Sequence, residues 1–360
     1  MYLLNTSHDN FMGKVKVAIV GVGNCASNFV QGIEYYRNDK SNSVGLMHRV
    51  AGGYDIGDME VVAAFDIAEG KVGQDLSLAI FAPPNCTKTI TSVPEMGVIV
   101  QKGPVLDGWG PHFEGIVTVS PEPECDIEQV LRDSKADVMV ILLPSGSDQA
   151  CYTYIKAALN LGIGVVNGIP VLASHDPEIV RLAEENKTSI IGDDFKSQLG
   201  GTILHHTLMH LFQIRGIEIN KSYQINYGGN TDFLNLQTPR GSEKHKSKAR
   251  GIKAGSDNNF DLSVNVSYIE NQDDNKTCRI WIEGQNFSGC PVTFEGKLTV
   301  VDSANSSGVL ADAIRCIMVA KRMGIYGRLD APSAYFMKSP YIQMPDELAY
   351  KATDEFLMNP

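Results

Sequence analysis

The chain has 360 residues, 43% of them hydrophobic, which is enough to bury a large core and usually corresponds to two domains. A formal net charge of -11 argues against a nucleic-acid partner, and no apolar run approaches the roughly 20 residues that a membrane helix needs. The seven cysteines are scattered without a CxxC pair, and residues 1–13 lack a secretory signal, so we expect reduced thiols and a cytoplasmic location without membrane contact.

Short β-branched runs alternate with helical stretches over the first 200 residues or so. This alternation predicts βαβ units built around a parallel sheet. Two long interruptions, residues 38–60 and 77–117, are predicted to be insertions or loops over a site. The expected strands are residues 15–20, 61–65, 138–143, 164–166 and 189–191.

The pattern changes near residue 204, after the start of a helix expected over residues 203–212. Period-two alternation in the segments that follow predicts an antiparallel sheet with one covered face. Helical character returns over residues 309–322, and a Pro-punctuated tail precedes a last short helix near residues 346–357. The alternating segments are residues 217–227, 262–269, 279–283 and 293–301.

A glycine-rich turn lies between the first expected strand and the apolar helix after it. Glycines are needed where a turn is tight and where backbone approaches a pyrophosphate, whose charge then faces a helix N-terminus. The turn therefore predicts a dinucleotide site, with a ligand-free tight turn as the alternative. The predicted cofactor-binding residues are Gly21, Gly23, Asn24, Cys25 and Ala26, where Ala26 takes the position of the third glycine.

Asp66 ends the second expected strand. A carboxylate at this point accepts hydrogen bonds from a ribose diol and favours NAD over NADP, although a plain surface aspartate is the alternative. The spacing from the glycine turn exceeds the usual ~20 residues, which the interruption at residues 38–60 explains.

A second motif of small and polar residues, residues 192–202, again lies between a strand and a helix. The free N–H groups of a helix start, with the hydroxyls of Ser197 and Thr202, would form a cradle for a substrate phosphate. An equally acceptable interpretation is that the two hydroxyls only cap the helix.

Lysines supply the cations that a phosphate site needs. Residues 244–253 form a basic run; such runs are usually solvated, but a lysine whose pKa is depressed can also relay a proton or stabilise an oxyanion. Lys276 and Lys338 stand alone, and by themselves are more typical of a surface. His206 and His210 share a helix face without a third metal ligand, so helix-surface histidines are the favoured interpretation.

Five motifs, in order, resemble the inositol-1-phosphate synthase family, most of all its shorter bacterial and archaeal branch. The resemblance runs from about Lys14 to the C-terminus. The motifs are GVGNCAS (21–27), GDDFKSQ (192–198), NYGGNTDFLN (226–235), VDSANSSG (301–308) and SAYFMKSP (333–340). One departure is Thr231, where the nearest family members carry Met, and another is the short basic loop at residues 239–253.

The resemblance implies an α/β fold with a Rossmann-type doubly wound parallel sheet, formed by residues 1–203 and completed by residues 302–360. An inserted α+β domain, residues 204–301, would carry catalysis and assemble a homotetramer. The implied reaction converts D-glucose 6-phosphate to 1D-myo-inositol 3-phosphate through NAD-dependent oxidation at C5, enolisation, intramolecular aldol addition and re-reduction. The alternatives are a related cyclase for another sugar phosphate, a simple NAD dehydrogenase and a non-catalytic NAD-binding assembly protein.

The resemblance also implies site residues. Four lysines would surround the substrate: Lys244 and Lys338 for proton relay and oxyanion stabilisation, Lys248 and Lys276 for phosphate and charge stabilisation. Asp302 and Ser303 would lie near the nicotinamide, where many relatives also hold a divalent metal. Further cofactor contacts are implied at Ser145, Asn167 and Asp194. The implied substrate-binding residues are Ser197, Gln198, Leu199, Gly200, Thr202, Asn230 and Asp232.

Overall fold

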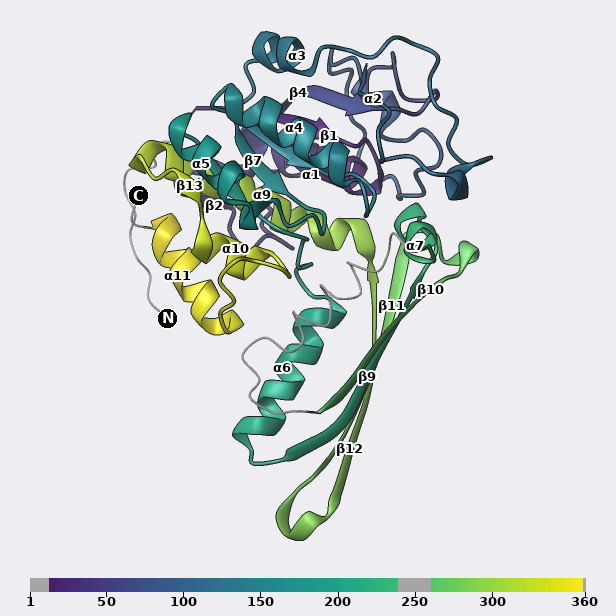
Figure 1. Ribbon diagram of the computed structural model, residues 1–360, viewed down its shortest axis with the longest axis vertical. Coiled ribbons are helices and arrows are strands. Elements are labelled where there is room, and N and C mark those ends of the chain that lie inside the picture. The colour runs from purple at the N-terminus through teal and green to yellow at the C-terminus, as the bar shows by residue number, and fades with distance from the viewer. Residues whose placement is uncertain (1–12, 239–259, 359–360) are drawn as a thin grey trace.

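Seven parallel strands form the central sheet of this computed structural model, which describes residues 13–238 and 260–358 (Figure 1). Their order is β13-β8-β7-β6-β1-β4-β5, so the chain reverses direction across the sheet between β6 and β1. The five predicted strands are all present, with ends shifted by two residues or fewer, and the doubly wound α/β prediction is confirmed. The strands are β1 (Val15–Val20), β4 (Met59–Asp66), β5 (Gln101–Lys102), β6 (Val138–Ile141), β7 (Gly164–Asn167), β8 (Ser189–Ile191) and β13 (Gly327–Arg328).

Helices cover both faces of this sheet, which is why its inner strands read as continuous apolar runs. Val17 and Ile19 of β1 face one core together with α1 and α9, whereas Ala18 and Val20 face the other with α3, α4 and α5. The helices are α1 (Asn24–Asn38), α2 (Leu76–Ala79), α3 (Ile127–Ser134), α4 (Asp148–Asn160), α5 (Pro177–Glu185), α9 (Asp302–Met323), α10 (Asp330–Phe336) and α11 (Asp346–Met358).

A second sheet of four long strands extends away from this body, with α6 (Gly201–Ile214) along one face (Figure 1). Met209 and Phe212 of α6 pack against Ile219, Ile280 and Ile282 of the strands, so the covered face was correctly predicted. The order is β10-β9-β11-β12, and α7 (Thr231–Leu236) follows β9. The strands are β9 (Glu218–Gly228), β10 (Asp261–Tyr268), β11 (Asn275–Gln285) and β12 (Pro291–Val301).

The prediction of a wholly antiparallel second sheet is wrong at one pair. β11 pairs antiparallel with both β9 and β12, but β10 runs parallel to β9. Parallel neighbours need a crossover of a dozen residues or more, and the connection over residues 229–260 is long enough to provide it. Periodicity alone does not reveal this direction, because both kinds of pairing alternate their side chains.

The two long interruptions behave differently. Residues 38–60 contain the hairpin β2 (Val50–Ala51) and β3 (Tyr54–Asp55), which packs against α9. There the fully buried Arg315 donates to the backbone oxygens of His48 and Arg49. This interruption therefore packs against α9, and none of its residues lines the cavity described below.

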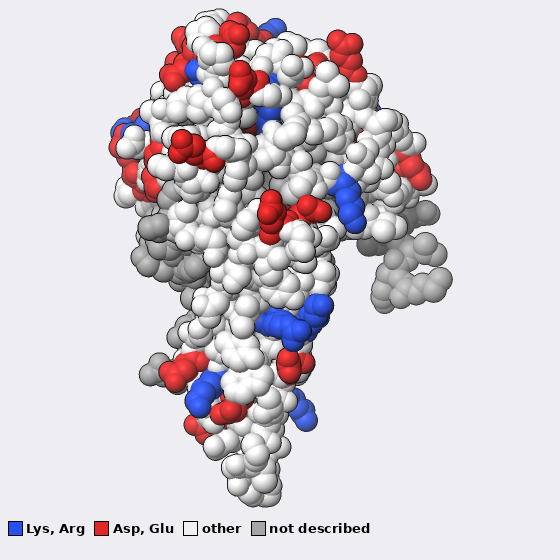
Figure 2. All heavy atoms as spheres, turned by 90° about the vertical axis from the view of Figure 1, so that its right-hand side faces the viewer, with Lys and Arg blue, Asp and Glu red and all other residues white. Residues whose placement is uncertain are grey.

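The distribution of charged side chains and the lengths of the helices bear on two kinds of partner, nucleic acids and membranes. On the face drawn in Figure 2, acidic and basic side chains are interspersed, so this face has no extended basic surface of the kind that a nucleic acid requires. Within the described residues, no helix combines the length and apolar character needed to cross a membrane. All seven cysteines are free thiols.

Candidate active site

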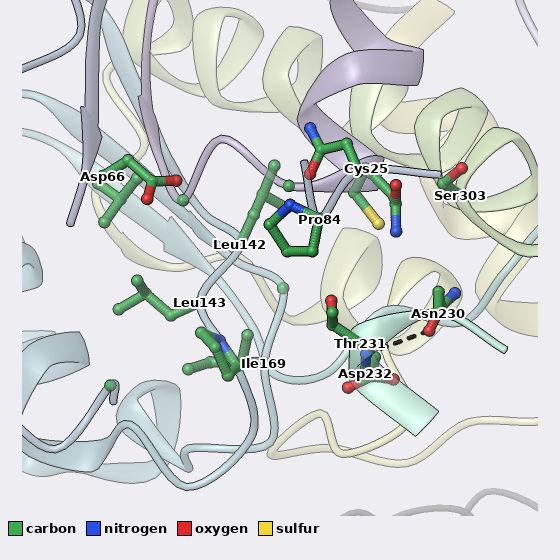
Figure 3. A pocket seen from close by; sticks show the side chains of 18 of the residues that line it. Cys25, Asp66, Pro84, Leu142, Leu143, Ile169, Asn230, Thr231, Asp232 and Ser303 are labelled. Atoms are coloured by element: carbon green, nitrogen blue, oxygen red, sulfur yellow. Dashed lines mark hydrogen bonds between the residues drawn. The ribbon is translucent and has the colours of Figure 1, made fainter. Parts of the chain in front are cut away.

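A cavity of about 250 Å³ opens beside the carboxyl ends of β1, β4 and β6. In doubly wound folds, ligands bind in this place, where the strand order reverses. Asp66 lies at one end of the cavity, and Asn230, Asp232 and Ser303 lie at the other (Figure 3). The predicted site residues that line it are Gly21, Gly23, Asn24, Cys25, Asp66, Asp194, Ser197, Asn230, Asp232, Lys276, Asp302, Ser303 and Lys338.

The glycine turn has the geometry that a pyrophosphate site needs. Gly21 has a φ of +95°, and a Cβ there would lie 2.7 Å from the backbone oxygen of Leu142. Gly23 caps α1, and no atom lies within 4 Å of the place that its Cβ would take. A ligand can therefore approach the backbone at the helix start. Ala26 is buried behind the turn and does not line the cavity.

Asp66 holds the turn while facing the cavity. Its Oδ2 accepts the N–H of Val22 at 2.8 Å, and its Oδ1 accepts those of Ile67 and Ala68 at 2.7 and 2.9 Å. Two carboxylate oxygens offer about four acceptor positions, so one position remains for a ribose hydroxyl. A neutral diol suits this carboxylate better than a 2′-phosphate does, because the phosphate would bring like charge.

Lys338 and Asp194 form an ion pair at the opposite end. Lys338 Nζ lies 2.8 Å from Asp194 Oδ1, and the N–H of Lys338 donates to the backbone oxygen of Asp194 at 2.7 Å. Behind them, buried Asp193 accepts from Ser174 Oγ at 2.7 Å and from Asn167 Nδ2 at 2.6 Å. Burial raises the pKa of Asp193 to about 7. Asn167 thus supports the Asp193–Asp194 turn and is not among the residues that line the cavity.

Lys276 and Asp302 form the second ion pair, with Nζ and Oδ1 2.8 Å apart. Lys276 comes from β11 and Asp302 begins α9. Next to them, buried Asp274 accepts from the hydroxyl of Ser303 and, at 3.0 Å, from Asn230 Nδ2. Burial raises the pKa of Asp274 to about 6. The sequence analysis singled out Lys276 but missed this nearby carboxyl group.

Asn230 also organises α7. Its Oδ1 accepts the N–H groups of Asp232 and Phe233 at 3.1 and 3.2 Å, so Asn230 is the N-cap of the helix. The cap and the bond to Asp274 fix the start of α7, where Asp232 and Thr231 line the cavity.

The motif at residues 192–202 forms a smaller space of about 20 Å³ beside the cavity. Ser197, Lys276 and Lys338 line both spaces, and Gly200 and Thr202 line the smaller one. Gly200 is the N-cap of α6 and no side chain caps the helix, so the interpretation of Ser197 and Thr202 as caps is wrong. The N–H groups at the start of α6 have no intrahelical acceptors, which suits an anion.

Gln198 and Leu199 have other partners. Their N–H groups donate to the backbone oxygen and to Oδ1 of Asn305, at 2.9 and 3.0 Å. Neither residue lines the two spaces, and Ser145 does not line them either. Contact of these three residues with a ligand stays a prediction. Lys244 and Lys248 lie outside the described residues.

A divalent metal does not fit the residues at Asp302 and Ser303. Asp302 is paired with Lys276, and the hydroxyl of Ser303 donates to Asp274. Across residues 13–238 and 260–358, no group of three His, Cys, Asp or Glu side chains is arranged to hold a metal ion. A ligand set of one paired carboxylate and one engaged hydroxyl is too small for a divalent cation.

Residues that no sequence motif marks individually also line the cavity. Leu106, Trp109, Phe113 and Val117 come from residues 77–117, which confirms that this interruption lies over the site. Lys71 lines the cavity near the glycine turn and is only 3% exposed. No motif surrounds Lys71 in the sequence, so only its position in the fold reveals it.

The fold and the site together define a Rossmann-type, dinucleotide-dependent enzyme. The glycine turn and Asp66 lie at one end of the cavity, here named the cofactor end, and two lysine–aspartate pairs lie beside a helix start at the other, here named the substrate end.

Comparison with known proteins gives the particular family. The sequence model of the myo-inositol-1-phosphate synthase family matches residues 200–303. The inositol-3-phosphate synthase of Mycolicibacterium smegmatis is 42% identical and aligns over 96% of this chain and 98% of its own. The crystal structure of Ari2 superposes with a TM-score of 0.79 at 32% identity, over 96% of this chain and 98% of that one. A myo-inositol-1-phosphate synthase-related protein from Thermotoga maritima superposes with a TM-score of 0.78 at 25% identity, over 95% and 97%.

The chain therefore belongs to the inositol-3-phosphate synthase family, a family of NAD-dependent enzymes.

Proposed function

We propose that the protein is an NAD-dependent cyclase that converts D-glucose 6-phosphate to 1D-myo-inositol 3-phosphate without net oxidation. The observation that carries this proposal is that the cavity with the glycine turn adjoins the smaller space at the start of α6. Ser197, Lys276 and Lys338 line both spaces. A phosphate held at the start of α6 would therefore leave the sugar carbons facing the cofactor end.

The residues at the cofactor end fit NAD. Gly21 and Gly23 let the diphosphate approach the backbone, Asp66 accepts from a ribose, and the apolar residues of 77–117 cover this end of the cavity. When bound there, NAD supplies a reversible hydride acceptor for C5 of the sugar. Asp302 and Ser303 are proposed to lie at its nicotinamide end, and Asn24, Cys25 and Asp194 to complete its contacts.

The lysines are proposed to act on oxygens that become negatively charged. Oxidation at C5 acidifies the protons on C6, and the resulting enolate adds to the C1 aldehyde. Lys338, held by Asp194, and Lys276, held by Asp302, would stabilise the developing oxyanions and exchange protons with them. Preorganised charges of this kind need no rearrangement during the reaction. Lys244 and Lys248 are proposed to complete the set.

The substrate phosphate is proposed to bind between Ser197, Thr202 and the N–H groups at the start of α6. Asn230 and Asp232 are proposed to orient the sugar hydroxyls from the start of α7. Because the donor set at Asp302 does not fit a divalent metal, the reaction is written without one.

The remaining assignments are also proposals. Residues 1–203 with 302–360 would form the NAD domain, and residues 204–301 the catalytic and oligomerisation domain of a cytoplasmic homotetramer. The two separate hydrophobic clusters of the seven-stranded sheet and the third cluster beneath α6 support this division.

A cyclase for another sugar phosphate is the second candidate. It is favoured by Thr231, which departs from the residue of the nearest family members and lines the cavity beside Asp232 (Figure 3). The difference would change which hydroxyl pattern fits the pocket.

One experiment tests both candidates. The purified protein is incubated with catalytic NAD and either glucose 6-phosphate, fructose 6-phosphate or mannose 6-phosphate, while the sugar is followed by NMR and NADH by absorbance. A cyclic inositol phosphate from glucose 6-phosphate without net NADH is the expected result. Cyclisation of a different sugar alone would favour the second candidate, and stoichiometric NADH would indicate a simple dehydrogenase.

A further inference from the structure

Lys71 is a buried cation at the cofactor end of the cavity. It follows β4 in the turn after Asp66, is 3% exposed and lines the cavity. Its Nζ donates to the backbone oxygen of Val22 at 2.7 Å and to Asn85 Oδ1 at 2.9 Å. Two of the three N–H groups of the ammonium are therefore used, and the third is available to a ligand.

The contact with Val22 places this ammonium at the glycine turn itself. Val22 is the residue between Gly21 and Gly23, and both its N–H and its backbone oxygen are hydrogen-bonded to side chains. Its N–H donates to Asp66, and its backbone oxygen accepts from both Lys71 and Asn85 Nδ2, the latter at 3.1 Å. The charge of Lys71 thus lies beside the backbone that a diphosphate approaches.

The charge of Lys71 has no carboxylate partner within ion-pair distance among residues 13–238 and 260–358. Lys276 and Lys338 both have such partners, although their side chains are more exposed. Burial lowers the pKa of Lys71, and the charge of Asp66 opposes this only in part. A buried cation without a partner is unfavourable by several kcal/mol. Bracing Val22 and Asn85 requires hydrogen-bond donors but no charge, so the charge itself needs another explanation.

We infer that Lys71 binds the diphosphate of the cofactor and supplies the positive charge that the glycine turn lacks. This inference rests on the proposed function, in which the cavity holds a dinucleotide. When the cofactor binds, its diphosphate meets a Lys71 ammonium that is already removed from water. Charge-assisted hydrogen bonds are strongest in such a buried place. Lys71 also bonds Asn85, which belongs to the interruption over the cavity. A diphosphate bound to Lys71 would therefore be linked to the covering segment as well.

The test separates the charge of Lys71 from its role as a brace. NAD, ADP and adenosine are titrated against the wild-type protein and Lys71→Gln, by calorimetry for the tight ligands and by NMR for adenosine. Glutamine keeps donor groups and removes the charge. We expect Lys71→Gln to bind NAD and ADP more weakly by about 10- to 100-fold, and adenosine within about twofold of wild type. Lys71→Arg should recover part of the loss for ADP. Lys297→Gln, at an exposed position on β12, serves as the matched control and should bind all three ligands normally.

Two outcomes overturn the inference while leaving the proposed function intact. Equal loss of ADP and adenosine affinity would mean that Lys71 only braces the turn, and unchanged ADP affinity would mean that it does not meet the diphosphate. Failure of the wild-type protein to bind NAD at all would overturn the cofactor site itself and the inference with it.

If Lys71→Gln does not fold, the wild-type protein still provides a test. Because burial lowers the pKa of Lys71, a bound diphosphate should favour its charged form. ADP affinity is then expected to fall as the pH rises above neutrality toward the ordinary lysine range, with adenosine affinity unchanged. A flat profile for ADP would contradict the inference.

Discussion

At the scale of single residues, the end of the cavity proposed to hold the substrate contains two lysines that come from distant parts of the chain. Lys338 and Asp194 are 144 positions apart in the sequence, whereas Lys276 and Asp302 are 26 apart. Each carboxylate holds its ammonium beside the small space at the start of α6. If the proposed roles are correct, removing one lysine should affect the chemistry far more than cofactor binding.

We predict that Lys338→Ala lowers kcat by about a hundredfold or more and leaves the Kd for NAD nearly unchanged. The measurement is steady-state kinetics together with NAD titration. Because the substitution leaves the 1%-exposed Asp194 carboxylate without this partner, the double variant Lys338→Ala/Asp194→Asn should also be prepared to remove both charges. Lys351→Ala, on the exposed face of α11, is the control. Near wild-type turnover of Lys338→Ala would disprove the proposed role.

At the scale of elements, the interruption at residues 77–117 is tied to α7 by one buried side chain. Asn235 is fully buried, its Oδ1 lies 2.9 Å from His112 Nε2, and its Nδ2 donates to the backbone oxygen of Ser145 at 2.9 Å. The same interruption contributes Asp107, which accepts the N–H groups of Gln149 and Ala150 at the start of α4. The covering segment is therefore held to α7 on one side and to the start of α4 on the other.

Asn235→Ala should weaken NAD binding by roughly tenfold, because each lost hydrogen bond contributes about 1 kcal/mol to the closed arrangement. The Kd for NAD is measured by calorimetry. Gln237→Ala, an exposed change just past the same helix, is the control and should bind NAD normally. Wild-type affinity in Asn235→Ala would show that this link does not position the cofactor site.

At the scale of the whole molecule, the first residue of the C-terminal helix bonds both to the segment before α6 and to α6 itself. Asp346, at the start of α11, bonds Lys196 Nζ at 2.6 Å and His206 Nδ1 at 2.8 Å. His206 was expected on the helix surface, but its side chain is only 14% exposed. Burial alone would raise the pKa of Asp346, yet His206 and Lys196 outweigh it and lower the pKa to about 2.

Asp346→Asn should reduce stability by about 3 kcal/mol at neutral pH, because Lys196 then becomes a buried cation without its partner. A carboxyl group with a lowered pKa stabilises the fold above its unfolded pKa of about 3.9 and loses this effect as the pH falls through about 2. The difference between variant and wild type should therefore shrink between these two values. Chemical denaturation over this range is the measurement. Glu178→Gln, in the exposed pair with Lys156, should change stability by less than about 1 kcal/mol. A pH-independent difference would contradict this account.

Local sequence patterns were enough to predict those features in which neighbouring residues act on one another. β-branched runs predicted the parallel strands, and the glycine turn with Asp66 predicted residues that line the cavity, because steric limits and burial act on neighbouring residues. The resemblance of five motifs pointed to Lys276, Lys338 and the start of α6. Hydrophobic periodicity could not have done so, because it predicts helices and strands but does not identify individual site residues.

The tertiary structure, in contrast, was needed to show which distant groups meet. It paired each lysine with its aspartate, placed Asp274 beneath Ser303, and brought Lys71 to the wall of the cavity without a carboxylate partner among the described residues. It also set β10 parallel to β9, which side-chain alternation leaves open. The physical reason is the same in each case: ion pairing, burial of charge and strand direction are set by long-range packing, which no local sequence window contains.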